Sequence, residues 1–265
     1  MECIMCHSNN IVRNGKYKVY QKYKCNACNR QFSERNFSFF FRHRFPEHVI
    51  KNSILYSFFV STRHVAFLAK ETMKSMFSHQ TAYNWSKKFA KMIGKIKQTL
   101  DFSNIWHIDE KFIRCRNKKD RKGNVKFSYL WVVIDSNNNI IATHVSHNRD
   151  IVNAAKALRK AKNVANKPPD VLVTDGLKSY KKACKKVFGR KTKHVVAHFK
   201  TKGFMHKGKL YYLINNRIES LNSKINLWYK RFRGFKSIEI AMLWTESFNY
   251  FYNYLQLYAA KSYRE

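Results

Sequence analysis

Residues 105–113 read IWHIDEKFI, and this apolar run with an acidic pair inside it decides the fold. The run is typical of a strand, and residues 126–134 (KFSYLWVVI) predict a second one. A polar turn at 135–139 (DSNNN) then leads to a third strand over 140–145. We expect these three strands to be antiparallel.

Helices and strands alternate after this point. The pattern predicts a helix over 150–162, a short buried strand over 171–175, a helix over 177–188, a strand over 194–198 and a helix over 215–231. Three antiparallel strands followed by alternating elements indicate an α/β fold. We therefore expect a mixed five-stranded sheet with helices on both faces.

The charge balance points to a polyanionic partner. The chain has 265 residues, with 52 Lys and Arg against 16 Asp and Glu, so its formal net charge is +36. Hydrophobic residues make up 45% and aromatic residues 15%, which excludes intrinsic disorder. The sequence therefore describes a folded and very basic protein.

No stretch of the sequence predicts a membrane span or a signal peptide. Within the hydrophobic region 37–62, the longest uncharged run is 52–62, well short of the roughly 20 residues that a membrane helix needs. We expect a cytoplasmic protein, in which cysteines stay reduced and bind metal more often than they pair.

Four of the six cysteines form two CxxC pairs. Cys3 and Cys6 are followed, after eighteen residues, by Cys25 and Cys28, and this spacing predicts one structural Zn²⁺ held in a zinc ribbon over 1–36. The alternative is four unrelated thiols in a reduced protein. The isolated Cys115 and Cys184 are expected to be small buried hydrophobes.

Residues 37–100 have the pattern of a helical DNA-binding domain. A helix starts at Pro46-Glu47, an amphipathic helix covers 61–70, and Ser78 can cap a third helix. This order predicts a helix-turn-helix, and the alternative is a structural helix pair. The candidate DNA contacts on the third helix are Gln80, Thr81, Tyr83, Asn84, Lys87 and Lys88.

Acidic residues are scarce, so each position is informative. Asp109 lies within the first strand and Asp175 at the carboxyl end of the fourth, where both fit a two-metal phosphoryl-transfer site. Glu219 is a third candidate, or else an ion-pair partner for nearby bases. The other positions have structural explanations: Asp135 as a turn residue, Asp150 as a helix N-cap, and Glu239 and Glu246 as solvated positions on the last helix.

Several motifs together resemble a known family. They are Asp109-Glu110 after Trp106, Thr174-Asp175-Gly176 after a buried strand, Ser179-Tyr180, residues 215–219 (NNRIE) and residues 233–237 (RGFKS). Over residues 60–250 the sequence resembles the DDE transposases of prokaryotic insertion sequences, in particular the integrase-like insertion sequence family six.

The resemblance implies a ribonuclease H-like catalytic domain over 101–265. It also implies two Mg²⁺ or Mn²⁺ ions per active site, held by Asp109, Asp175 and Glu219. The implied function is binding of the terminal inverted repeats, followed by metal-dependent DNA strand cleavage and strand transfer. The implied partners are double-stranded DNA, both transposon ends and target, and at least a second copy of the chain in the synaptic complex, in a nucleoid-associated protein.

Two departures from the family pattern concern DNA contacts. The interval between Asp175 and Glu219 holds 43 residues, longer than is usual in the family, and we expect the basic stretch Phe199–Leu213 with Lys207 to be a DNA-contacting insertion. Asn226 stands where the family has a basic residue. Lys224 or Lys230 is the expected substitute.

Three other functions fit part of the sequence. A zinc-ribbon and helix-turn-helix regulator would explain residues 1–100 but leaves the acidic α/β region without a role. A ribonuclease H-like structure-specific nuclease would share the carboxylates. An inactive transposase remnant is the third alternative, although all three acidic positions are intact.

Overall fold

The computed structural model describes residues 1–17, 20–33, 36, 40, 43–93, 100–119, 123, 125–197, 204–206, 208–211 and 216–262. Its first unit is a small antiparallel sheet in the order β1-β2-β3, with β1 at Ile11–Tyr17, β2 at Tyr20–Cys25 and β3 at Gln31–Ser33. Cys3, Cys25 and Phe32 form its small buried core.

Three helices follow: α1 (Glu47–Tyr56), α2 (Thr62–Met73) and α3 (His79–Ile93). They agree with the expected helices, and Ser78 caps α3 as predicted, since its Oγ accepts a hydrogen bond from the N–H of Thr81 at 3.2 Å. Trp85 on the inner face of α3 packs against Phe45 and Phe77, which closes a small aromatic core.

The large sheet has the order β6-β5-β4-β7-β8. Its first three strands, β4 (Ile105–Lys119), β5 (Val125–Asp135) and β6 (Ile140–Ser146), are antiparallel. The other two, β7 (Val171–Thr174) and β8 (Lys193–Val196), run parallel to β4. The mixed five-stranded sheet is therefore confirmed.

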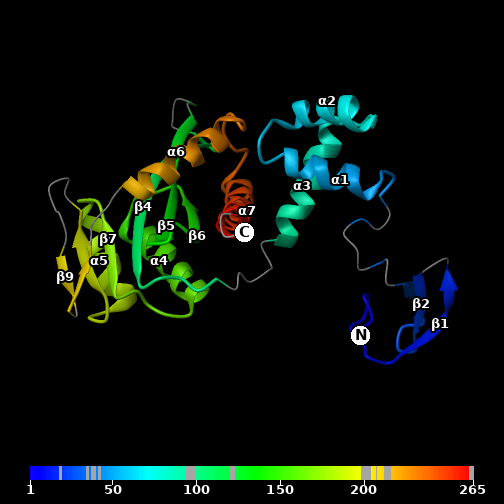
Figure 1. Cartoon of the computed structure of the whole chain (residues 1–265), viewed down its shortest axis with the longest axis horizontal. Coiled ribbons are helices and arrows are strands. Elements are labelled where there is room, and N and C mark those ends of the chain that lie inside the picture. The colour runs from blue at the N-terminus through cyan, green and yellow to red at the C-terminus, as the bar shows by residue number, and fades with distance from the viewer. Residues whose placement is uncertain are drawn as a thin grey trace.

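Helices cover both faces of this sheet (Figure 1). On one face lie α4 (Ile151–Ala165) and α5 (Lys178–Phe188), and on the other lie α6 (Asn216–Lys230) and α7 (Ile238–Ser262). The small side chains on the inner face of α4 let it approach the sheet closely; they are Ala154, Ala155, Ala157 and Ala161. This layered arrangement is the ribonuclease H-like fold that the sequence predicts.

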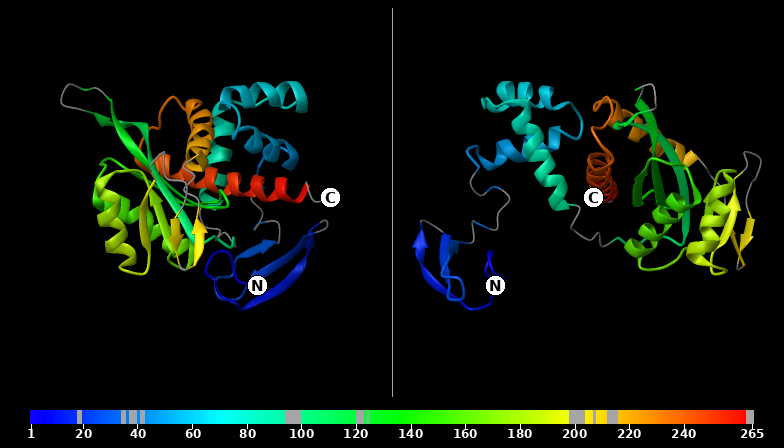
Figure 2. Two further views of the ribbon diagram at one scale, coloured as in Figure 1. Left: turned by 60° about the vertical axis from the view of Figure 1, so that its left-hand side comes forward. Right: turned by 180° about the vertical axis from the view of Figure 1, so that it is seen from behind.

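The helical unit packs against α7, as the views in Figure 2 also show. Phe58, just after α1, stacks on Phe251 with ring centroids 4.3 Å apart, and Tyr83 of α3 lies 6.2 Å from Trp244. Helices α3 and α7 therefore share an apolar contact that joins the helical unit to the layer covering the sheet. None of the helices in the described ranges is long and apolar enough to span a membrane.

The long interval before α6 contains a two-stranded element. Strands β9 (Phe204–His206) and β10 (Lys209–Tyr211) pair antiparallel, and Gly208 in their turn has a φ of 72°, which glycine adopts readily. This hairpin occupies part of the expected insertion Phe199–Leu213. Lys207 lies outside the described residues.

Among the structural assignments for acidic residues, those of Asp150 and Glu239 are correct and that of Glu246 needs a correction. Asp150 caps α4 by accepting a hydrogen bond from the N–H of Asn153 at 2.8 Å. Glu239 is exposed. Glu246, in contrast, is only partly solvated, because it forms an ion pair with Lys160 where α4 and α7 both pack on the edge strand β6.

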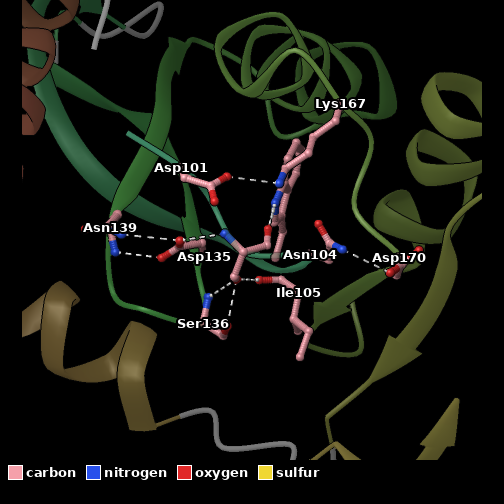
Figure 3. Close-up of polar contacts among 10 residues, drawn as sticks. Asp101, Asn104, Ile105, Asp135, Ser136, Asn139, Lys167 and Asp170 are labelled. Carbon is pink, nitrogen blue, oxygen red and sulfur yellow. Dashed lines mark hydrogen bonds and ion pairs between the residues drawn. The ribbon is translucent and has the colours of Figure 1, made fainter. Parts of the chain in front are cut away.

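Asp135 has the turn role that the sequence predicts, in a fully buried position. Its Oδ1 accepts hydrogen bonds from the N–H groups of Asn137 and Asn139 at 2.9 and 2.8 Å. Its Oδ2 accepts from the N–H of Ser103 at 3.0 Å and the side-chain amide of Asn139 at 3.3 Å (Figure 3). Asp135 thus ties the β5–β6 turn to the segment entering β4.

We expect Asp135→Asn to lower the free energy of unfolding by about 1–3 kcal/mol, because an amide NH₂ would face N–H donors that a carboxylate oxygen now satisfies. Urea unfolding measures the loss. The control is Asp150→Asn, since Asn caps a helix about as well as Asp and should cost only about a few tenths of a kcal/mol. Equal stability of the two variants would contradict this role for Asp135.

Candidate active site

Neighbouring strands bring Asp109 and Asp175 together. In the parallel pairing of β4 with β7, Ile105 lies opposite Val171 and His107 opposite Val173. Continuing this register by two residues places Asp175, which directly follows β7, beside Asp109. Residues in register on adjacent strands point to the same face, so both carboxylates lie on one side of the sheet.

Glu110 joins these two carboxylates. Oxygen atoms of Asp109, Glu110 and Asp175 all lie within 4.8 Å of one another, and each of the three residues is partly buried. Oxygen ligands at this spacing suit a hard divalent cation such as Mg²⁺ or Mn²⁺. Three carboxylates this close also repel one another, and a bound cation would relieve that repulsion.

Asp109 is oriented by two hydrogen bonds. Its Oδ1 accepts from the N–H of Glu110 at 2.9 Å, and its Oδ2 accepts from the side-chain amide of Asn222 on α6 at 2.8 Å. Burial raises the pKa of Asp109, the Asn222 hydrogen bond lowers it, and the charge of Asp175 raises it again, with a net upward shift. The environment of Asp109 therefore disfavours an uncompensated negative charge.

Glu110 points to the opposite face of β4, where both of its oxygens have partners. Oε1 pairs with the guanidinium of Arg149, and Oε2 accepts a hydrogen bond from the hydroxyl of Tyr180. Burial raises the pKa of Glu110, and the bond from Tyr180 and the charge of Arg149 offset this only in part. The pKa of Tyr180 is well above its usual value because of burial and the charge of Glu110.

Glu219, the third predicted carboxylate, lies on the first turn of α6 with its side chain exposed. Among the residues that the structure describes, the close acidic group includes Glu110 and does not include Glu219. The side chain on α6 that reaches Asp109 is Asn222, three residues further along. Residues three apart share a helix face, so Glu219 lies one turn from this contact.

The predicted DNA-binding residues of α3 differ in accessibility. Gln80 and Asn84 are exposed and hydrogen bond to each other at 3.0 Å. The hydroxyl of Thr81 bonds to that of Ser78, while Tyr83 is half-buried against Trp244. Of the two lysines, Lys87 is half-buried and Lys88 is exposed, with its Nζ 3.1 Å from His43 Nε2.

The two predicted lysines of α6 are both exposed. The Nζ of Lys224 lies 5.3 Å from the centre of the Tyr252 ring. Lys230 is in the last turn of the helix.

The four N-terminal cysteines form the second candidate metal centre. All four sulfur atoms lie within 4.8 Å of one another, and the pairs Cys3–Cys28 and Cys6–Cys25 are each 3.6 Å apart. A Zn–S bond of about 2.3 Å in a tetrahedron requires sulfur atoms about 3.8 Å apart, so the group has the size of a Zn²⁺ site.

The two CxxC turns also share a backbone conformation. The residue after each turn has a positive φ, 58° at His7 and 56° at Asn29. Asn adopts this conformation more readily than most residues. The same local turn therefore presents each of the two cysteine pairs to the group.

The family follows from the catalytic region. The model of the DDE domain matches residues 103–256, which is more than half of the chain and includes the whole large sheet with α4 to α6. The chain belongs to the DDE transposase family. The family expected from the sequence motifs is thereby confirmed at this level.

This DDE transposase matches no curated protein. A chain in the cryo-EM structure of the simian T-cell lymphotropic virus intasome in complex with PP2A regulatory subunit B56 gamma is similar, with 16% identity and a TM-score of 0.35. The similarity covers 68% of the transposase chain, which spans 58% of the length of the intasome chain.

Four residues around the acidic group were given no role from the sequence: Glu110, Arg149, Tyr180 and Asn222. Glu110 and Tyr180 were quoted only within motifs, and the residue after a strand carboxylate points to the other face. The partners of Glu110 come from α5 and from the segment just before the N-cap of α4, so no local pattern connects them. Asn222 is neutral, and its spacing from Glu219 on one helix face was the only available signal.

Proposed function

We propose that this DDE transposase is of the insertion sequence family six type. In this proposal it binds the terminal inverted repeats of its element, cleaves a DNA strand there and joins the freed 3′ end to target DNA. The observation that carries the proposal is the pair Asp109 and Asp175, adjacent on neighbouring strands of a ribonuclease H-like sheet within the DDE region.

The proposed metal ligands are Asp109, Asp175 and Glu219, for two Mg²⁺ or Mn²⁺ ions. Asp109 and Asp175 fit such ions, because they offer hard oxygen ligands within 4.8 Å of each other. When bound, such ions supply activation of the attacking hydroxyl and neutralisation of the charge that develops on the phosphate. No covalent nucleophile from the chain is needed.

Glu219 lies one helical turn from the α6 side chain that reaches Asp109. Asn222 contacts Asp109, and side chains three residues apart on a helix are about 5–6 Å apart at Cβ. The longer side chain of Glu219 extends from the same face of α6 and is exposed, and we propose that it turns toward Asp109 to complete the ligand set.

Lys111 keeps α6 against the sheet at this point. Its Nζ donates to the backbone carbonyl of Asn222 at 3.1 Å, and burial lowers its pKa. Because Lys111 lies two residues after Asp109, it faces the same side of β4. The helix that carries Glu219 is thus tied to the strand that carries Asp109.

Double-stranded DNA is the proposed partner, and the net charge of +36 supports it. On α3, Gln80 and Asn84 are exposed in the N-terminal half of the helix, where a recognition helix contacts base edges. Tyr83 is less suited to this role, because its ring packs against Trp244. Lys224 and Lys230 remain proposed contacts to the DNA backbone.

The remaining parts of the proposal concern organisation. We propose three domains, a zinc ribbon at 1–36 with one Zn²⁺ on Cys3, Cys6, Cys25 and Cys28, a helix-turn-helix domain at 37–100 and the catalytic domain at 101–265. We also propose a dimer or larger assembly when two ends are synapsed. The proposed location is the cytoplasm, in association with the nucleoid.

The test uses labelled duplexes that tile the DNA on both sides of the coding sequence. Full-length protein with Mg²⁺ or Mn²⁺ is expected to nick one duplex at a single position and to join that 3′ end to a second DNA. Nicking without joining would favour a ribonuclease H-like nuclease. Specific binding without nicking in either metal would favour a regulator or an inactive remnant.

The exposed pair on α3 gives a separate prediction about recognition. Gln80→Ala with Asn84→Ala should lower the preference for the nicked duplex over a scrambled one by about tenfold or more, since each lost base contact costs about 1–3 kcal/mol. Affinity for scrambled DNA should change by less than about twofold. Competition binding at fixed salt measures both, and an equal loss on both duplexes would move recognition away from α3.

A further inference from the structure

The starting observation is the environment of Glu110. Its side chain is only 3% exposed, and its two oxygens bind different partners, Arg149 and Tyr180. Tyr180 is fully buried and packs edge-on against Trp131 in the core, with ring centroids 5.9 Å apart. The phenol is therefore a rigid donor, and it fixes the orientation of the Glu110 carboxylate.

This geometry argues that Glu110 is not a metal ligand, although it lies within 4.8 Å of Asp109 and Asp175. A metal ligand directs an oxygen lone pair at the ion, and the Glu110 carboxylate is turned to the face of β4 opposite to that of Asp109. Each Glu110 oxygen is already bound to a charged or buried donor from the α4 and α5 side of the sheet. The structure instead gives Glu110 the role of holding another side chain in position.

Arg149 is the group that Glu110 holds. Its side chain keeps 35% of its surface exposed, more than ten times the exposed fraction of its partner Glu110. The guanidinium has five N–H donors, and within the described part of the chain its one ion pair is with Glu110. Donors therefore remain for a second ligand on the accessible side.

The position of these donors defines the ligand. Arg149 is joined through Glu110 to the acidic group that we propose to hold the divalent ions. DNA entering this site brings a phosphate toward three carboxylates, which repel it. A guanidinium held beside them offers the planar, paired donors that match a phosphate.

We propose that Arg149 binds a DNA phosphate at the active site and that Glu110, fixed by Tyr180, is the positioning residue that holds its guanidinium there. This inference rests on the proposed function, because it needs DNA at the Asp109–Asp175 pair. It adds Arg149 to the residues that contact substrate.

The test measures two quantities on full-length variants: the single-turnover nicking rate on the duplex that the wild type cleaves, and Mg²⁺ binding by calorimetry without DNA. Arg149→Ala should lower the rate about 100-fold and Arg149→Lys about tenfold, because Lys keeps the charge and loses the paired donors. The fraction of DNA finally nicked should stay unchanged. A folding defect would lower that fraction instead.

Mg²⁺ binding separates a positioning role from a ligand role. Arg149→Ala should bind Mg²⁺ as well as the wild type or more tightly, because a nearby positive charge is gone. Glu110→Gln should keep Mg²⁺ affinity within about threefold while its nicking rate falls about tenfold. Asp109→Asn is the comparison that should lose Mg²⁺ binding. Lys160→Met, which breaks the ion pair between Lys160 of α4 and Glu246 of α7, should behave as wild type.

Three results would overturn the inference. If Arg149→Ala nicks DNA at the wild-type rate, the proposed contact between Arg149 and a phosphate is excluded, while the proposed function stands. Loss of Mg²⁺ binding in Glu110→Gln as complete as in Asp109→Asn would make Glu110 a ligand. A wild-type protein that nicks no duplex would overturn the proposed function and this inference with it.

Discussion

Asp109→Asn and Asp175→Asn should each lower DNA nicking and joining by at least about 10³-fold, while DNA binding persists or tightens slightly. Asn keeps the shape of Asp and an oxygen acceptor but loses the charge that holds a divalent cation. Removing a negative charge near the bound phosphate explains the small gain in binding. Nicking under single-turnover conditions and binding without metal measure the two halves of the prediction.

Thermal unfolding gives a readout for the same variants that does not depend on activity. Because burial and the charge of Asp175 raise the pKa of Asp109, its charged form is disfavoured, and Asp109→Asn should not lower the metal-free Tm. The rise in Tm that Mg²⁺ gives the wild type should disappear. The matched control is Asp150→Asn, which changes a helix cap and should stay active.

Glu219→Gln tests the third ligand separately. We expect it to be as inactive as Asp109→Asn. If Glu219→Gln nicks DNA normally while Glu110→Gln is inert and no longer binds Mg²⁺, the triad is Asp109, Glu110 and Asp175, and the resemblance at residues 215–219 assigned the wrong carboxylate.

The second large effect concerns the N-terminal cysteines. Elemental analysis should find one Zn²⁺ per chain, and Cys25→Ser should reduce this to none and unfold the β1–β3 sheet. The reason is that, among the residues the structure describes, the buried core of this sheet consists of Cys3, Cys25 and Phe32, too little to fold it without metal. Structural Zn²⁺ contributes on the order of 10 kcal/mol to such small domains.

Proteolysis of the zinc-depleted protein locates the effect. Cleavage within residues 1–33 should become at least about tenfold faster, and the large sheet should stay resistant. Met5→Leu is the control, because Met5 lies between two of the cysteines but is 51% exposed and supplies no ligand. A wild-type protein purified under reducing conditions that holds no Zn²⁺ and still protects residues 1–33 would disprove the zinc ribbon.

Most of the sheet was predictable because its strands are short apolar runs between polar turns. Strand β4 is longer than predicted, ending at Lys119 and not at Ile113, because residues 114–119 are mostly polar and are held by backbone pairing with β5 and with Phe235. Backbone pairing of that kind leaves no apolar pattern. The β9–β10 hairpin was missed for the same reason, as its two strands are held by pairing with each other.

The candidate site was predictable only where chemistry and topology coincide. Asp109 and Asp175 stand at strand positions that parallel pairing brings together, so the sequence pattern was enough. Glu110 depends on Tyr180, 70 residues away, and on Arg149, and such distant pairs leave no periodic signal. The contact of Tyr83 with Trp244 of α7 was not predictable either, because helical spacing within α3 carries no information about a helix about 160 residues further along the chain.

The packing of α3 and of Phe58 on α7 has a mechanical consequence. Stacked and tilted aromatic rings are stiff contacts, and here they fix the helical unit to the layer that covers the sheet. If α3 recognises DNA as proposed, then its packing on α7 fixes the distance between the recognition helix and the active site. That distance sets the number of base pairs between the recognised sequence and the cleavage position. A smaller side chain at position 251 in place of Phe251 should therefore make the cleavage position less uniform before it lowers DNA affinity or the cleavage rate.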